Sequence, residues 1–72
     1  MGRYVVRWHE KAKDIFGDYS WYNRCEEECV RMNEAEELFD WLSECENEGL
    51  VRNVSLYDKA SKKIIKKYVP RD

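Results

Sequence analysis

The side chains able to act as nucleophiles or metal ligands are three cysteines, Cys25, Cys29 and Cys45, and the single histidine, His9. Tetrahedral zinc holds its cysteine sulfurs about 2.3 Å from the metal. Cys25 and Cys29 are spaced C-x₃-C, so they could share a metal on a helix, whereas in a strand they would lie about 13 Å apart. Because we expect residues 20–32 to form a strand, the sequence predicts no metal site and no cofactor.

Nucleophilic catalysis needs a base beside the nucleophile, and His9 is the only histidine. A pair between His9 and Cys25 or Cys29 on neighbouring strands is conceivable, but no nucleophile elbow, glycine-rich phosphate loop or HExxH motif surrounds it. A chain of 72 residues also buries only a thin core, and an enzyme cleft would remove part of that core. We therefore predict that the protein is not an enzyme.

The clearest predicted element is a helix from about Glu34 to Glu48. Asn33 is typical of an N-cap, and Gly49 is typical of the residue that follows a helix C-terminus. Apolar residues recur between them at helical spacing, which predicts one buried stripe. The stripe consists of Ala35, Leu38, Phe39, Leu42 and Cys45.

Strands are predicted on both sides of this helix. Residues 4–8 form one strand, and residues 50–57 and 62–69 form the two strands of a C-terminal hairpin. Asp58 begins the turn of that hairpin, where its carboxylate could accept a hydrogen bond from the backbone two residues on. Residues 10–20 are expected to be a loop with its turn at Gly17-Asp18.

Residues 20–32 allow two interpretations. As a strand they complete the order ββαββ, and as a helical stripe they join the following helix in a βαββ fold. The strand is favoured because an N-cap residue at Asn33 would have no free backbone N–H groups to bind in the middle of a helix. We therefore predict a single small α+β domain over residues 1–72, an antiparallel sheet with one helix packed on one face. Its expected core is Val6, Leu38, Phe39, Leu42, Leu50, Val54 and Leu56.

Charge is divided along the chain although the net charge is only −2. Residues 25–49 carry −9, whereas residues 1–24 carry +2 and residues 50–72 carry +5. An exposed helix ordinarily interleaves lysine with its acids, yet residues 32–51 contain no basic residue. The acidic side chains of this segment repel one another, and this cost is tolerable if the helix face that carries them meets a basic protein surface, including one that binds nucleic-acid phosphates. The predicted acidic binding face is Glu34, Glu37, Asp40 and Glu44.

Two other surfaces are alternatives to the acidic face. The basic C-terminal hairpin suggests binding of single-stranded nucleic acid, with phosphates on lysines and bases stacked on rings. Its predicted contacts are Tyr57, Lys62, Lys66 and Tyr68. An uncovered aromatic sheet face would be an apolar patch able to bind a protein partner or to form a homodimer. That patch would contain Val5, Trp21 or Tyr22, Tyr57 and Tyr68.

The pattern from Glu34 to Tyr68 is an acidic capped helix, a glycine, a strand, an Asp-centred turn and a lysine-rich strand. It resembles small uncharacterised ββαββ proteins of phages and mobile elements. The resemblance implies a cytoplasmic accessory or inhibitor protein that binds a host macromolecule, and it implies no catalytic residue and no ligand. No stretch approaches the roughly 18 apolar residues of a membrane helix, and the odd cysteine count does not indicate a disulfide scaffold. We therefore expect a cytoplasmic protein that does not bind membranes.

Overall fold

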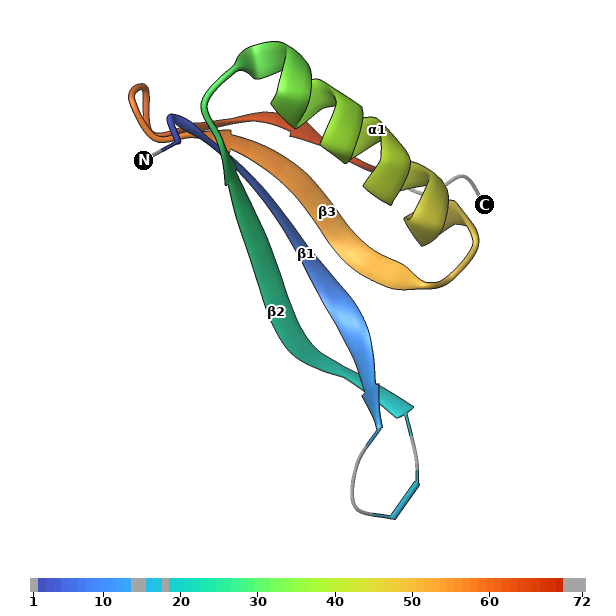
Figure 1. The fold of residues 1–72 in the computed structure, drawn as a ribbon. Coiled ribbons are helices and arrows are strands. Elements are labelled where there is room, and N and C mark those ends of the chain that lie inside the picture. The colour runs from blue at the N-terminus through green and yellow to red at the C-terminus, as the bar shows by residue number, and fades with distance from the viewer. Residues whose placement is uncertain (1, 14–15, 18, 70–72) are drawn as a thin grey trace.

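The computed structural model describes residues 2–13, 16–17 and 19–69, without the side chains of residues 13 and 19–22. The strands are β1 (Tyr4–Lys13), β2 (Tyr19–Cys29), β3 (Val51–Asp58) and β4 (Lys63–Lys67), and the helix is α1 (Met32–Asn47). The strands pair antiparallel in the order β2-β1-β3-β4, and α1 packs on one face of the sheet (Figure 1). The predicted ββαββ domain is confirmed, and the βαββ alternative is wrong because residues 19–29 form β2.

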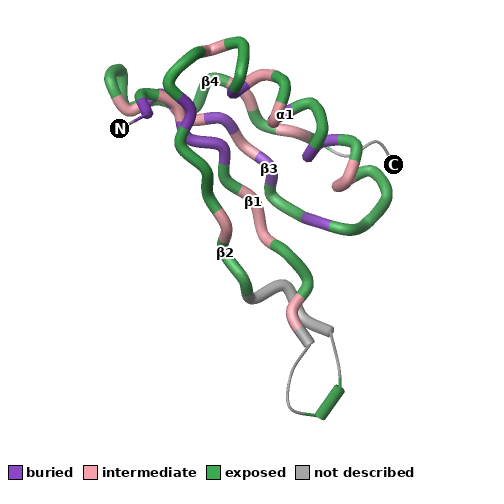
Figure 2. Tube along the Cα trace, in the orientation of Figure 1, coloured by how far each residue is buried: buried purple, intermediate pink, exposed green. Residues whose placement is uncertain are grey.

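The core lies between α1 and the two central strands, β1 and β3 (Figure 2). Val6, Val54 and Leu56 are fully buried, and Phe39 and Leu42 cover them from the helix. These five residues were all predicted to be core. Two other predicted core residues differ: Leu38 is half-buried at the edge of the core, and Leu50 is exposed.

A β-bulge in β3 explains why Leu50 is exposed. The register between β1 and β3 shifts beside Asn53, whose φ of 57° places it in the left-handed region. The extra residue reverses the inward and outward alternation on its N-terminal side. Val51 therefore joins Val54 in the core and Leu50 faces solvent. A strict two-residue period over residues 50–57 could not predict this reversal.

The helix begins earlier than its predicted cap. The N-cap is Arg31, whose carbonyl accepts the first helical hydrogen bond from the Ala35 N–H at 3.1 Å. Asn33 lies inside the first turn, so its prediction as N-cap is wrong. The earlier start lets Met32 extend the buried stripe and pack against the core. Packing of this side chain takes the place of a side-chain cap hydrogen bond, which would supply about 1 kcal/mol.

The predicted end of the helix is confirmed. Gly49 has a φ of 83°, and its N–H donates to the carbonyl of Glu46 at 3.0 Å. The N–H of Leu50 donates to the carbonyl of Cys45 at 2.9 Å, which completes a Schellman motif. Glycine suits this position because a Cβ is disfavoured at positive φ.

Strand β1 is longer than predicted because it continues to Lys13, whereas β2 begins at Tyr19 and ends at Cys29, before the predicted end at residue 32. Much of the expected loop over residues 10–20 belongs to them, and the resulting hairpin extends beyond the end of α1 (Figure 1). Gly17 has the positive φ of a turn residue, at 88°, whereas Asp18 lies outside the described residues. In the part of the chain that the structure describes, no helix is long and apolar enough to cross a membrane.

Asp58 joins the start of the chain to the β3–β4 turn. Arg3 donates to its carboxylate through Nε at 3.0 Å and Nη2 at 3.1 Å. The Ala60 N–H donates to the same carboxylate at 2.9 Å, which confirms the predicted side-chain bond to the backbone two residues on. The backbone adds a further link, because the Lys59 N–H donates to the Arg3 carbonyl at 2.9 Å.

This arrangement predicts a loss of stability in acid. The hydrogen bond from Arg3, assisted by the Ala60 N–H, lowers the pKa of Asp58 to about 2. An unfolded aspartate has a pKa of about 3.9, so the unfolded chain binds more protons between about pH 5 and pH 2. Stability should therefore fall as the pH falls through this window. In urea unfolding at stepped pH, Asp58→Asn and Arg3→Gln should both make this slope shallower, and an unchanged slope in both variants would contradict this role for the pair.

Candidate functional site

The six acidic residues of α1 divide into two groups. Glu36 and Glu46 interact within the fold: Glu36 lies 3.7 Å from the Lys66 ammonium, and Glu46 accepts a 3.0 Å hydrogen bond from the Val54 N–H beside the bulge. The other four are exposed and form no hydrogen bond or ion pair with any residue in the described part of the chain. These four are the predicted set of Glu34, Glu37, Asp40 and Glu44.

Trp41 lies among these carboxylates, and 60% of its surface is exposed. Glu37 is four residues before it and Glu44 is three residues after it, so both are its neighbours on the helix surface. The half-buried Leu38 and Cys45 lie three residues before it and four after it, at the edge of the core. Trp41 therefore stands where the apolar edge of the helix meets the acidic face. We refer to Trp41 with Glu34, Glu37, Asp40 and Glu44 as the Trp41 face.

Sequence reasoning predicted the four carboxylates as a binding face and did not include the tryptophan. Trp41 does not belong to the stripe of Ala35, Leu38, Phe39 and Leu42, so the helical period alone places it away from the core. Trp41 could have been found from the sequence, because it is a large aromatic residue outside the buried stripe of an amphipathic helix.

The Trp41 face lowers the stability of its own helix. Glu34 and Glu37, Glu37 and Asp40, and Asp40 and Glu44 are like charges spaced three or four residues apart, a spacing that destabilises a helix. Glu44 also lies in the last turn, where the helix dipole disfavours negative charge and where no basic residue compensates.

Removing these charges should stabilise the protein. Each of the three pairs costs about 0.2–0.5 kcal/mol, so the triple variant Glu37→Gln, Asp40→Asn, Glu44→Gln should gain roughly 1 kcal/mol in free energy of unfolding. For a domain of this size, that gain corresponds to an increase of about 4–8 °C in Tm. Differential scanning calorimetry at low salt measures it. A lower Tm would show that these carboxylates serve the fold.

The alternative nucleic-acid site is divided between the two faces of the sheet. Tyr57 and Lys62 border the uncovered face, together with Val5 and Arg7. Lys66 instead lies on the helix side, with its ammonium 5.8 Å from the centre of the Phe39 ring, and Tyr68 packs against the core. The four predicted contacts therefore do not form one surface. Three lysines of the hairpin, Lys63, Lys66 and Lys67, lie on β4, an edge strand, where charge discourages pairing between molecules.

The uncovered face is more polar than the predicted apolar patch. Val5 is buried there, with only 3% of its surface exposed. The Arg7 guanidinium lies over Tyr57, 4.8 Å from the ring centre, and the Lys59 ammonium pairs with Glu28. Tyr68 was predicted on this face, but it contacts the opposite side of the sheet. The side chains of Trp21 and Tyr22 lie outside the described residues.

The cysteines do not assemble with His9. Cys25 lies opposite Trp8 in β1, and its thiol donates weakly to the Asn23 carbonyl at 3.9 Å. Burial and the nearby Glu10 raise the pKa of Cys25, and burial also raises the pKa of Cys29. Both shifts disfavour the reactive thiolate at neutral pH. All three cysteines are free, and among the described residues no three His, Cys, Asp or Glu side chains are grouped to hold a metal ion.

No protein-family model matches this chain, and comparison with curated proteins and with solved structures gives no match. The resemblance to proteins of phages and mobile elements therefore stays a prediction.

Proposed function

We propose that this protein is a non-catalytic binding protein of the accessory or inhibitor type, and that its Trp41 face docks on a basic surface of a protein partner. The observation that carries the proposal is the exposure of Trp41 among four carboxylates that form no hydrogen bond or ion pair with the described residues. The expected partner surface has an apolar pocket for the indole, surrounded by lysine and arginine side chains.

Trp41 supports this proposal because tryptophan is enriched at the energetic centres of protein interfaces. Its indole supplies a large apolar area with few rotatable bonds, so little conformational entropy is lost on binding. In the free protein that area is exposed to water, whereas the neighbouring Leu42 is buried in the core, with only 2% of its surface exposed. Of these two adjacent residues, Trp41 is therefore available for binding, whereas Leu42 stabilises the fold.

The carboxylates support a basic partner. Their mutual repulsion would be relieved when lysine or arginine side chains approach, and complementary charge also accelerates encounter between two proteins. The acids that stabilise the fold, Glu36 and Glu46, are not required for this contact because they already interact with Lys66 and Val54. Binding through the four exposed carboxylates should weaken as salt increases.

The same proposal includes a non-catalytic role in the cytoplasm. The raised pKa values of Cys25 and Cys29 argue against a cysteine nucleophile. His9 shares a 2.7 Å hydrogen bond with the side chain of Asn53. Three free cysteines in a small domain fit a reducing compartment.

Affinity capture from the native cell with parallel baits tests the proposal. The baits are the wild-type chain, the triple variant Glu37→Gln, Asp40→Asn, Glu44→Gln, and the control Lys63→Gln, Lys67→Gln on β4. We expect one protein to be recovered by the wild type and by the control and to be lost from the triple variant. Because the triple variant should be more stable than the wild type, this loss cannot be attributed to unfolding.

Two results would count against the Trp41 face. In the first, the triple variant recovers the same partner as the wild type. In the second, only the β4 variant loses its partner and nuclease treatment releases that partner from the wild type, which would favour the nucleic-acid alternative instead.

A further inference from the structure

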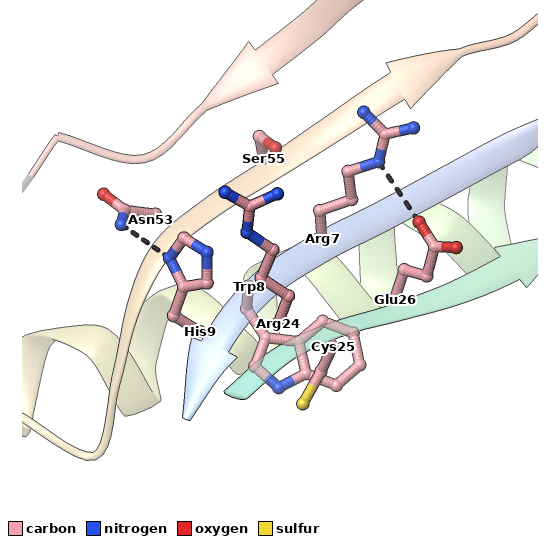
Figure 3. A pocket seen from close by; sticks show the side chains of 8 residues that line it. All are labelled: Arg7, Trp8, His9, Arg24, Cys25, Glu26, Asn53 and Ser55. Carbon is pink, nitrogen blue, oxygen red and sulfur yellow. Dashed lines mark hydrogen bonds and ion pairs between the residues drawn. The ribbon is translucent and has the colours of Figure 1, made fainter. Parts of the chain in front are cut away.

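A separate surface, on the side of the sheet that α1 leaves uncovered, forms a pocket of about 510 Å³. Its polar lining comes from three adjacent strands: Arg7 and His9 from β1, Arg24 from β2, and Asn53 and Ser55 from β3. In the sheet register His9 lies opposite Arg24, and Arg7 lies opposite Ser55. Figure 3 shows these side chains together around the pocket.

Two guanidinium groups give the pocket its charge. Among the described residues, the only carboxylate in its lining is Glu26, whose oxygen lies 3.4 Å from Arg7 Nε, and both of these side chains are more than half exposed. Arg24 is exposed and has no ion pair in the described part of the chain. Arg24 therefore keeps its donors available, whereas Arg7 is held by Glu26 and by the Tyr57 ring beneath it.

The bulge in β3 adds neutral hydrogen-bonding groups to the pocket. Asn53, in its left-handed conformation, places its amide nitrogen 2.7 Å from Nδ1 of His9. When the amide donates this bond, the neutral imidazole carries its proton on Nε2 and can donate from there. The Ser55 hydroxyl is a further donor in the lining. Donors thus outnumber acceptors in the pocket, the composition expected of an anion site.

We propose that this pocket binds the phosphate group of a small phosphate monoester. Guanidinium groups bind phosphate oxygens with paired, charge-assisted hydrogen bonds, which suits Arg7 and Arg24. The pocket volume falls in the range of small-molecule sites, so it has room for an organic group attached to the phosphate. The site shares no residue with the Trp41 face and is independent of the function proposed for that face.

Amide NMR titration of the full chain tests this site with three probes: inorganic phosphate, a nucleoside monophosphate, and the same nucleoside without phosphate. We expect the first two to cause saturable shifts at residues 7, 9, 24, 53 and 55, with a dissociation constant of about 1 mM or tighter for the monophosphate. The nucleoside should cause none. Because Arg24 makes no ion pair in the described part of the fold, Arg24→Gln should retain the spectrum of a folded protein and weaken binding at least about tenfold.

Two further variants separate a defined site from general surface charge. Lys63→Gln removes the same charge on β4, outside the pocket lining, and should bind the monophosphate as the wild type does. Glu26→Gln removes the competing carboxylate and should tighten binding several-fold, a gain that a merely structural role would not produce.

Three results would overturn the proposal. The first is the absence of saturable shifts with both phosphate probes. The second is equal weakening by Arg24→Gln and Lys63→Gln, which would indicate diffuse attraction to the surface. The third is binding of a single-stranded oligonucleotide at these residues without binding of the monophosphate, which would assign the pocket to a nucleic-acid backbone.

Discussion

Trp41→Ala is expected to weaken binding of the captured partner at least about 30-fold, equivalent to about 2 kcal/mol, because a central tryptophan often dominates an interface. The free energy of unfolding should change by no more than about 0.5 kcal/mol, since the indole is mostly exposed. Isothermal titration calorimetry measures the first effect and urea unfolding the second. Most of the loss should appear as faster dissociation, as is usual when a buried anchor is truncated.

The control for Trp41→Ala is Ile64→Ala on β4. Ile64 is exposed to a similar extent, 59% against 60%, but it lies outside the Trp41 face. Ile64→Ala should bind the partner with wild-type affinity. Equal losses of affinity in the two variants would mean that the interface does not centre on Trp41.

Leu42→Ala should have the opposite profile. Leu42 is among the largest fully buried side chains and packs in the core with Val6, Val54 and Leu56. Truncating a buried leucine costs about 2–5 kcal/mol through lost transfer energy and the cavity left behind. A domain of this length is stable by only about 4–11 kcal/mol, so the variant should lose a large share of its stability. Urea unfolding at neutral pH measures the change.

The variant should still bind its partner under conditions where it stays folded, because Leu42 is directed away from the Trp41 face. Leu42→Met is the matched control, since a volume-conserving change usually costs less than about 1.5 kcal/mol. A loss below about 1 kcal/mol for Leu42→Ala would show that α1 is not held to the sheet by this side chain.

The parts of the fold that follow from local periods were predictable from the sequence. The helical stripe of Ala35, Phe39 and Leu42, the glycine at the helix end and the carboxylate bond in the Asp58 turn are all present. Each depends on residues close together in the chain, where propensity and hydrogen bonding act directly. The assignment of residues 20–32 to a strand was correct for residues 20–29, although the strand ends before residue 30 and Asn33 does not form the cap on which that prediction relied.

The errors arose where contacts between distant segments decide the outcome. The bulge at Asn53 is defined by the pairing of β3 with β1, and the burial of Val51 in place of Leu50 follows from it. The start of the helix at Met32 likewise depends on the core that receives its side chain. The prediction of binding sites is limited in the same way by contacts between distant segments. Helical spacing groups the acids of α1, but only the fold shows that Arg7, Arg24 and His9 border one pocket on β1 and β2.

Fluorine NMR of the chain labelled with fluorotryptophan tests the central claim most directly. The chain contains three tryptophans, Trp8, Trp21 and Trp41, and substituting each by phenylalanine assigns the resonances. When the partner recovered by the wild-type bait is added to saturation, the Trp41 resonance should shift and become shielded from solvent, with the largest change of the three. A Trp41 resonance that stays unchanged and solvent-accessible in a saturated complex would contradict binding through this face.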